Sequence, residues 1–152
     1  LSDGKSSKLY KKIVDDKKMA LQIGAVGFSQ EDYGMYILYG LPMGTNTSAD
    51  LLKEIDEEIV KIQTELISEK DFQKLQNKFD NNFVNANASV EGIAENLATY
   101  YLLYKDVNLI NTEIELLHSI TREEIREVAK KYLNPNQRLV LDYVPSKEKA
   151  QN

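Results

Sequence analysis

The stretch MALQIGAVGFSQEDYGMYILYGL, residues 19–41, decides the fold class of this 152-residue chain. It contains two runs rich in aromatic and β-branched residues, 19–28 and 33–41, and this composition is typical of strands. Four polar residues at 29–32 separate the runs, so the stretch predicts an antiparallel hairpin. The second run is apolar on both faces, with Met35, Ile37 and Tyr39 on one and Tyr36 and Leu38 on the other. A sheet of this kind is expected to be covered on both faces.

Helical periodicity predicts the rest of the chain. Apolar residues recur at spacings of three and four, and capping residues stand at several expected starts. The expected helices cover residues 6–18, 47–66, 68–88, 89–105, 108–119 and 121–133. The run RLVLDYV at 138–144 predicts a final strand. The fold class is therefore α+β, with a small antiparallel sheet (the hairpin plus the C-terminal strand) packed by several helices.

Such a small sheet leaves a long unpaired edge, which either a strand preceding Leu1 or a partner is expected to fill. The overall charge argues against nucleic acid as that partner. Lys and Arg number 19 and Asp and Glu 24, giving a net charge of −5, and no basic stripe is evident. The longest uncharged apolar stretch is too short to span a bilayer.

Candidate chemical residues are few. His118 is the single histidine, the chain has no cysteine, and Arg122 stands at i+4 where a second metal ligand would be needed. We therefore expect a structural histidine. Acidic pairs such as 57–58 lie beside lysines and are interpreted as solvated helix faces. Tyr100 and Tyr104 lie on one helical stripe and are interpreted as core or interface, with ligand stacking as the alternative.

Four stretches together resemble one family. They are LSDGKSSKLYKKIVDDKKMALQIGA at 1–25, DYGMYI at 32–37, ISEKDFQKLQNKF at 67–79 and SITREEIREVAKKYLNPNQRLVLDYVP at 119–145. In this order they resemble the pitrilysin/insulinase zinc metallopeptidases, or inverzincins, and in particular their C-terminal, non-zinc-binding type of domain. The resemblance implies a single domain over residues 1–145 that lacks its first strand, followed by a polar tail at 146–152.

The resemblance also implies that zinc binding and catalysis belong to a different domain. In these enzymes an H-x-x-E-H helix binds zinc, and its glutamate activates the attacking water. This chain contains no such motif, so the resemblance implies no catalytic residue, metal site or cofactor here, and a zinc-bearing companion domain in the same or another chain. A peptide would be the substrate of the assembled chamber. Bacterial members are often exported, which favours the periplasm.

Two substrate-contact positions of the family are changed in this sequence. The non-zinc half often supplies an arginine and, seven residues later, a tyrosine near the scissile bond, and these positions correspond to Val14 and Leu21. The first hypothesis is a non-catalytic domain that walls the peptide chamber and supports the companion. The alternative is a structural or assembly subunit, or a degenerate inactive copy, that uses the same fold only for protein contacts.

Overall fold

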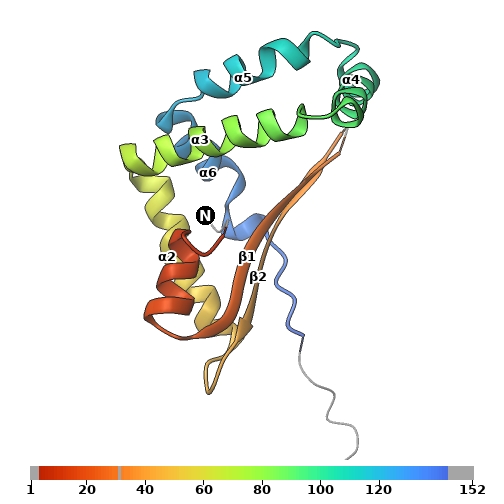
Figure 1. Ribbon diagram of the computed structural model, residues 1–152. Helices are drawn as coiled ribbons and strands as arrows, with labels where there is room; N and C mark the ends of the chain where they lie inside the picture. Colours follow the sequence, from red (N-terminus) through yellow and green to blue (C-terminus); the bar gives the residue numbers. More distant parts are fainter. Residues whose placement is uncertain (1–3, 31, 144–152) are drawn as a thin grey trace, which may run out of the picture. The chain divides into compact units, whose positions relative to one another are not determined.

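The computed structural model describes residues 4–30 and 32–143 (Figure 1). The described chain divides into two compact units. Unit 1 contains residues 4–28, 36–59 and 131–143, and unit 2 contains residues 29–35 and 60–130. A two-stranded antiparallel sheet and six α-helices confirm the α+β fold class.

The core of unit 1 lies between the first helical segment, the sheet and α2. Two short helical pieces, α1 (Lys8–Tyr10) and η1 (Lys11–Asp16), lead into β1 (Ala20–Ser29) and β2 (Gly34–Pro42), and α2 covers Ser48–Thr64. Seven buried residues make up the core: Leu9, Ile13, Ala20, Ile23, Leu51, Ile55 and Ile59. The three α2 residues recur every four positions, so they line one face of the helix as the sequence predicts.

The first predicted helix is only partly α-helical. After one α-turn the chain widens into the π-helix η1, in which the N–H of Lys17 donates to the carbonyl of Lys12 at 3.0 Å. Lys18 then adopts a left-handed backbone with φ of 51°, and the N–H of Met19 donates to the carbonyl of Ile13 at 2.9 Å. Helical periodicity alone does not distinguish a π-turn from an α-turn, and π-turns occur often at functional sites.

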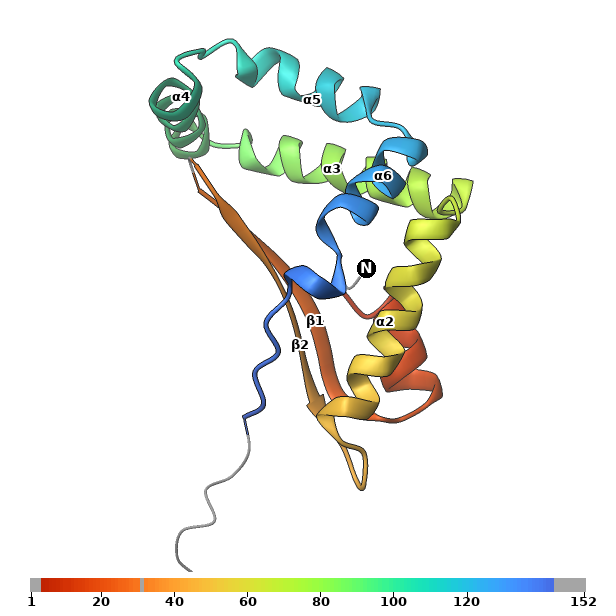
Figure 2. The same cartoon turned by 180° about the vertical axis from the view of Figure 1, so that it is seen from behind.

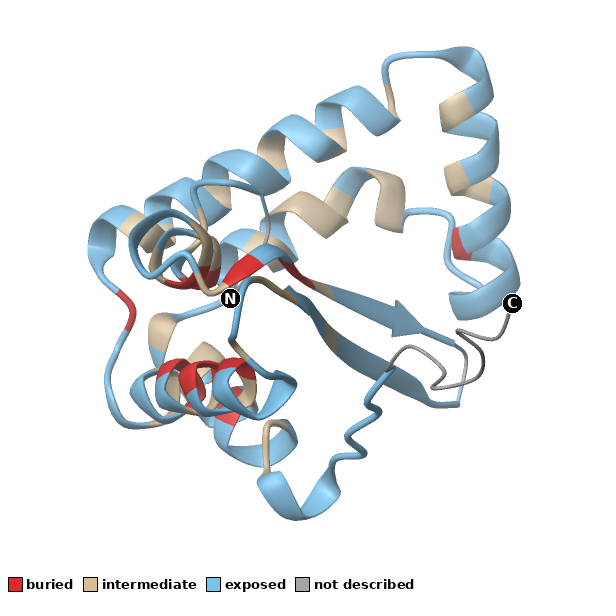
Figure 3. Ribbon diagram, turned by 90° about the horizontal axis from the view of Figure 1, so that it is seen from below, coloured by how far each residue is buried: buried red, intermediate tan, exposed pale blue. Residues whose placement is uncertain are grey.

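The predicted hairpin is confirmed, but its predicted cover is not present in the described chain. Ala20, Ile23 and Gly24 of β1 are buried, whereas five large apolar residues of β2 remain exposed. Those five are Met35, Tyr36, Ile37, Tyr39 and Leu41. Figure 3 shows this contrast, with buried segments gathered near α2 and most of the hairpin pale blue.

The prediction of a C-terminal strand at 138–144 is wrong for the part that the structure describes, because residues 138–143 join no sheet. A strand forms only where a neighbouring edge supplies hydrogen-bond partners, and composition cannot provide that edge. Instead the guanidinium of Arg138 forms a bidentate ion pair with the carboxylate of Asp56 on α2, and Nη2 lies 3.0 Å from Oδ2. Leu139, Leu141 and Tyr143 are exposed. Val144 and the predicted tail at 146–152 lie outside the described residues.

Unit 2 consists mainly of helices whose predicted starts are confirmed. They are α3 (Glu69–Ala86), α4 (Val90–Tyr104), α5 (Leu109–Ser119) and most of α6 (Arg122–Tyr132). Ser68 and Ser89 cap α3 and α4 by accepting backbone N–H donors at 3.1 Å. Thr121 and Glu124 form the predicted capping box ahead of α6. Figures 1 and 2 both show α3 and α5 side by side, with α4 joining them at one end.

After α6 the chain forms a short 3-10 turn, η2 (Pro135–Gln137), where Asn134 and Pro135 end the helix as predicted. Buried side chains are sparse in unit 2: Ile67, Tyr100 and Ala129 are its buried apolar residues among those described. None of the helices in the described ranges has the length and apolar composition that a membrane crossing needs.

Candidate functional site

Val14 and Leu21, the positions that the resemblance aligns with the family's substrate contacts, lie in unit 1 on neighbouring elements. Val14 belongs to η1 and is half-buried against the core of unit 1. Leu21 belongs to β1 and is 58% exposed. Both side chains are aliphatic, so neither can carry charge or donate a hydrogen bond to a peptide carbonyl. The chemistry that arginine and tyrosine supply is therefore absent at these two positions.

The residues that the structure describes do not fit a zinc ion. His118 on α5 lies with Nε2 2.6 Å from Oδ1 of Asp80 on α3, and both side chains are nearly half exposed. Structural and catalytic zinc sites need three or four protein ligands, and this sequence has one histidine and no cysteine. Within residues 4–30 and 32–143, no three His, Cys, Asp or Glu side chains are grouped to hold a metal. The His118–Asp80 pair instead joins two helices.

A buried ion cluster is the densest group of charges in unit 1. The ammonium of Lys12, on η1, lies 3.0 Å from Oε2 of Glu54, 2.9 Å from Oε2 of Glu57 and 3.1 Å from Oε1 of Glu58. Lys17 approaches the other oxygen of Glu54 at 2.5 Å. Glu54 and Glu58 are only 7% and 5% exposed, so the expectation that the 57–58 pair is solvated is wrong for Glu58.

Within the cluster, the surroundings of Lys12 and Glu54 favour their charged forms. Burial by itself would lower the pKa of Lys12, but hydrogen bonds to Glu57, Glu54 and Glu58 raise that pKa above its ordinary value. The hydrogen bond from Lys17 lowers the pKa of Glu54, against the opposing effect of burial, and Lys12 adds to the lowering. A general acid or base works best with a pKa near the operating pH. The shifts of Lys12 and Glu54 lead away from that range, and their ion pair joins the π-helix to α2.

The burial of Glu54 and Glu58 was not predicted, although the sequence contains a signal for it. They stand four residues apart, directly before the apolar Ile55 and Ile59, so they line the edge of the buried face of α2. The residue that neutralises them, Lys12, lies more than forty positions earlier. Recognising the pair requires knowing that η1 packs against α2.

The tyrosine stripe of α4 is divided between core and surface. Tyr100 is buried, and its hydroxyl donates to the carboxylate of Glu113 on α5. Burial, together with this hydrogen bond and the charge of Glu113, raises the pKa of Tyr100 to about 12. The core interpretation is confirmed for Tyr100. Tyr104, which was expected on the same stripe, is 63% exposed, and the nearby Tyr101 is 61% exposed.

Comparison with known proteins places the fold. No protein-family model and no curated protein matches the sequence. Solved structures do match. A protease from Helicobacter pylori matches 90% of this chain with a TM-score of 0.78 and 22% sequence identity. A protein assigned as a zinc protease from Bordetella pertussis Tohama I matches 96% of this chain with a TM-score of 0.79 and 19% sequence identity. The chain has the fold of these proteases. The periplasmic protease PqqL from Escherichia coli matches at 0.68 and 20% over 82%.

The resemblance drawn from the sequence is thus confirmed as a shared fold. The chain spans 33% of the Helicobacter pylori protease and 14% of PqqL, and 80% of the Bordetella pertussis chain. It therefore corresponds to part of the larger proteases.

Proposed function

We propose that this chain is a non-catalytic domain of a pitrilysin/insulinase-type zinc metallopeptidase. Its role is to form part of the peptide-binding chamber and to support a zinc-bearing H-x-x-E-H domain that this sequence does not contain. The observation that carries the proposal is a protease fold matched over 90% of the chain, while no three His, Cys, Asp or Glu side chains of the described part are grouped to hold a metal.

The exposed face of the hairpin supports the proposal physically. Apolar side chains of β1 and β2 lie at the surface of unit 1, among them Leu21 at 58%, Ile37 at 38% and Leu41 at 55% exposure. An exposed apolar sheet face is a common docking surface for a companion domain. A strand edge in addition offers backbone donors and acceptors to an extended peptide, which can bind by adding a strand. The same hairpin thus has two surfaces useful to a chamber wall.

The direct test is cleavage of an unstructured fluorogenic peptide by this chain, by the H-x-x-E-H companion, and by the two mixed. We expect cleavage in the mixture only, and its loss with a zinc chelator. Leu21→Asp, on the exposed hairpin face, is expected to weaken association, whereas Val128→Asp on α6, at a similar exposure of 55%, serves as the matched control. Cleavage by the isolated chain would contradict the proposal, as would a mixture no more active than the companion alone.

A second candidate function is a structural or assembly subunit, or a degenerate inactive copy, of the same fold. The aliphatic side chains at positions 14 and 21 favour it, because they remove the family's two polar substrate contacts. A companion that binds this chain but gains no cleavage would select this candidate. The double variant Val14→Arg, Leu21→Tyr then asks whether those two contacts were what the complex lacked. A gain in cleavage rate on restoring them would identify a degenerate chamber wall.

A further inference from the structure

The helix α4 is apolar on almost every side, yet Tyr100 is the one buried residue among the fifteen that the structure describes in it. A helix of this composition is normally covered by other parts of a protein. Successive residues turn by about 100°, so one arc of about 100° on α4 holds six residues, all of them exposed. We call this arc the outer face of α4, and it consists of Glu91, Ala94, Ala98, Tyr101, Leu102 and Lys105.

We propose that the outer face of α4 binds a second copy of this chain, with the two α4 helices packed antiparallel about a two-fold axis at Ala98. A two-fold axis repeats every contact, so a face that binds its own copy must complement itself. Glu91 stands seven residues before Ala98, and Lys105 stands seven residues after it. Seven residues are close to two helical turns, so both side chains lie on the same side of the helix as Ala98.

The charges of the outer face complement each other in this arrangement. Lys105 of one copy lies level with Glu91 of the second copy, and the reverse contact is identical. The Lys105 ammonium lies 5.4 Å from the centre of the Tyr101 ring and donates to the carbonyl of Leu102 at 3.0 Å, which keeps it at the outer face. An ammonium has three donors, so it can also bind the glutamate. Parallel helices would instead set like charges opposite each other, so the charges select the antiparallel pair.

The sizes of the side chains complement each other as well. Ala94 precedes Ala98 by four residues and Leu102 follows it by four, so each Ala94 lies level with Leu102 of the second copy. Leu102 and Tyr101 of one copy, both mainly exposed, then cover Ala94 of the other. The small Ala98 side chain at the axis lets the two helices approach closely, since the side chains at the contact set the distance between helix axes.

Two observations favour a second copy over other occupants. An unrelated partner would not require residues equally spaced about Ala98 to complement each other, whereas a second copy does. A net charge of −5, with Glu91 and Glu95 along the same helix, disfavours an anionic lipid surface. One helix pair buries less than the about 800 Å² per partner of a standard interface. We therefore expect a dissociation constant of about 10–100 µM.

The test measures self-association of this chain alone, so its outcome is separate from that of the proposed chamber. Sedimentation velocity is recorded at chain concentrations from about 1 to 500 µM, which span the expected Kd. Ala98→Glu sets two carboxylates at the axis and is expected to raise the Kd at least about tenfold. The matched control Thr99→Glu adds the same charge at the next exposed residue, about 100° around the helix, and is expected to change the Kd less than about twofold.

Mixing two charge variants tests the antiparallel pairing itself. Glu91→Lys alone and Lys105→Glu alone each set like charges opposite each other twice, so each is expected to raise the Kd at least about fivefold. An equal mixture of the two variants sets opposite charges together again and is expected to recover the original Kd to within about twofold.

Three results would overturn the proposal. They are a chain that stays monomeric at about 500 µM, equal effects of Ala98→Glu and Thr99→Glu, and a mixture that associates no better than its two components. A chain that is monomeric in solution but sediments with vesicles of phosphatidylcholine and phosphatidylserine, and loses this with Ala98→Glu, would assign the outer face of α4 to a membrane surface instead.

Discussion

Lys12 is the residue whose removal tests the account of unit 1 most directly. Its ammonium is the shared partner of Glu54, Glu57 and Glu58, two of which are buried. Lys12→Met keeps an unbranched chain of similar length but leaves buried carboxylates without that charge. Breaking a buried ion pair costs about 3–5 kcal/mol. Because the Lys12 side chain is 19% exposed, we expect the lower end, about 3 kcal/mol.

The assay is urea unfolding followed by far-UV circular dichroism, with the free energy of unfolding extrapolated to water. Lys11→Met is the matched control, since its exposed neighbouring side chain is expected to contribute less than about 0.5 kcal/mol. Adding Glu58→Gln to Lys12→Met should recover part of the loss, because a neutral amide is less costly to leave buried than a carboxylate. A loss below about 1 kcal/mol for Lys12→Met would refute the reasoning, since surface ion pairs contribute no more than that.

Three other substitutions test the helices and the acid dependence of the cluster. Replacing glycine by alanine inside a helix normally stabilises it by about 1 kcal/mol. In Gly92→Ala the added Cβ would lie 2.2 Å from the carbonyl oxygen of Ala86, so we expect a lower melting temperature. A higher melting temperature would contradict this contact. Tyr100→Phe should cost about 1 kcal/mol and remove from the ultraviolet titration the phenol that ionises at about pH 12. Loss of a phenol that ionises in the ordinary tyrosine range instead would argue against the buried bond to Glu113. The pKa of Glu54 is lower in the folded than in the unfolded state. The ionised Glu54 therefore stabilises the fold fully at pH values above its unfolded-state pKa, and this stabilisation is lost as the pH falls through its folded-state pKa. Glu54→Gln should therefore lose less stability than the unaltered chain between neutral pH and about pH 3; an identical acid dependence would show that Glu54 is not linked to folding.

Local sequence predicted the elements of this fold well. Ser68, Ser89 and Thr121 each mark a helix start that the structure contains. Each side chain accepts from the backbone N–H three residues later, and nothing distant is needed to recognise that pattern. The hairpin at 19–41 follows similarly from two strand-like runs and a polar turn.

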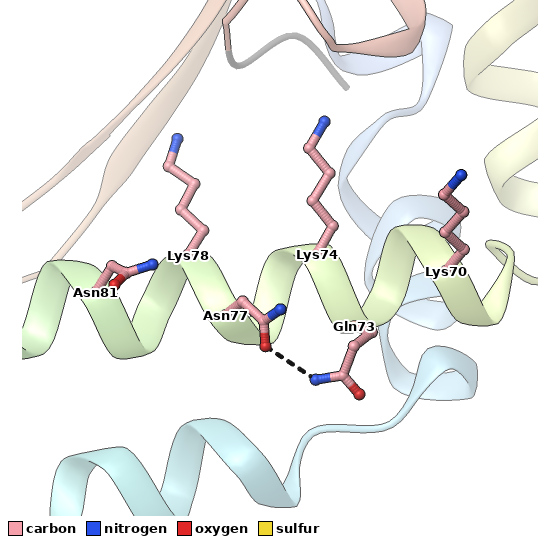
Figure 4. Close-up of a pocket in the computed structure, with 6 residues that line it drawn as sticks. All are labelled: Lys70, Gln73, Lys74, Asn77, Lys78 and Asn81. Atoms are coloured by element: carbon pink, nitrogen blue, oxygen red, sulfur yellow. Dashed lines mark hydrogen bonds between the residues drawn. The ribbon is translucent and has the colours of Figure 1, made fainter.

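The candidate site was less accessible to prediction. Val14 and Leu21 were placed by family resemblance, and their role in substrate contact stays a prediction. The π-helix that carries Val14 has the same apolar spacing as an α-helix, so the sequence does not reveal it. Figure 4 shows Lys70, Lys74 and Lys78 on one side of α3, which their spacing of four in the sequence already predicts.

The sequence by itself determined the α+β class, the hairpin and the capped helices, because those depend on interactions within a few residues. With one histidine and no cysteine, it also led us to expect no zinc site in this chain, which stays a prediction. Only the tertiary structure decided that Glu54 and Glu58 are buried around Lys12, and that Arg138 pairs with Asp56 where a strand was expected. Those outcomes depend on groups more than forty residues apart in the chain, whose approach is decided by packing and not by local pattern.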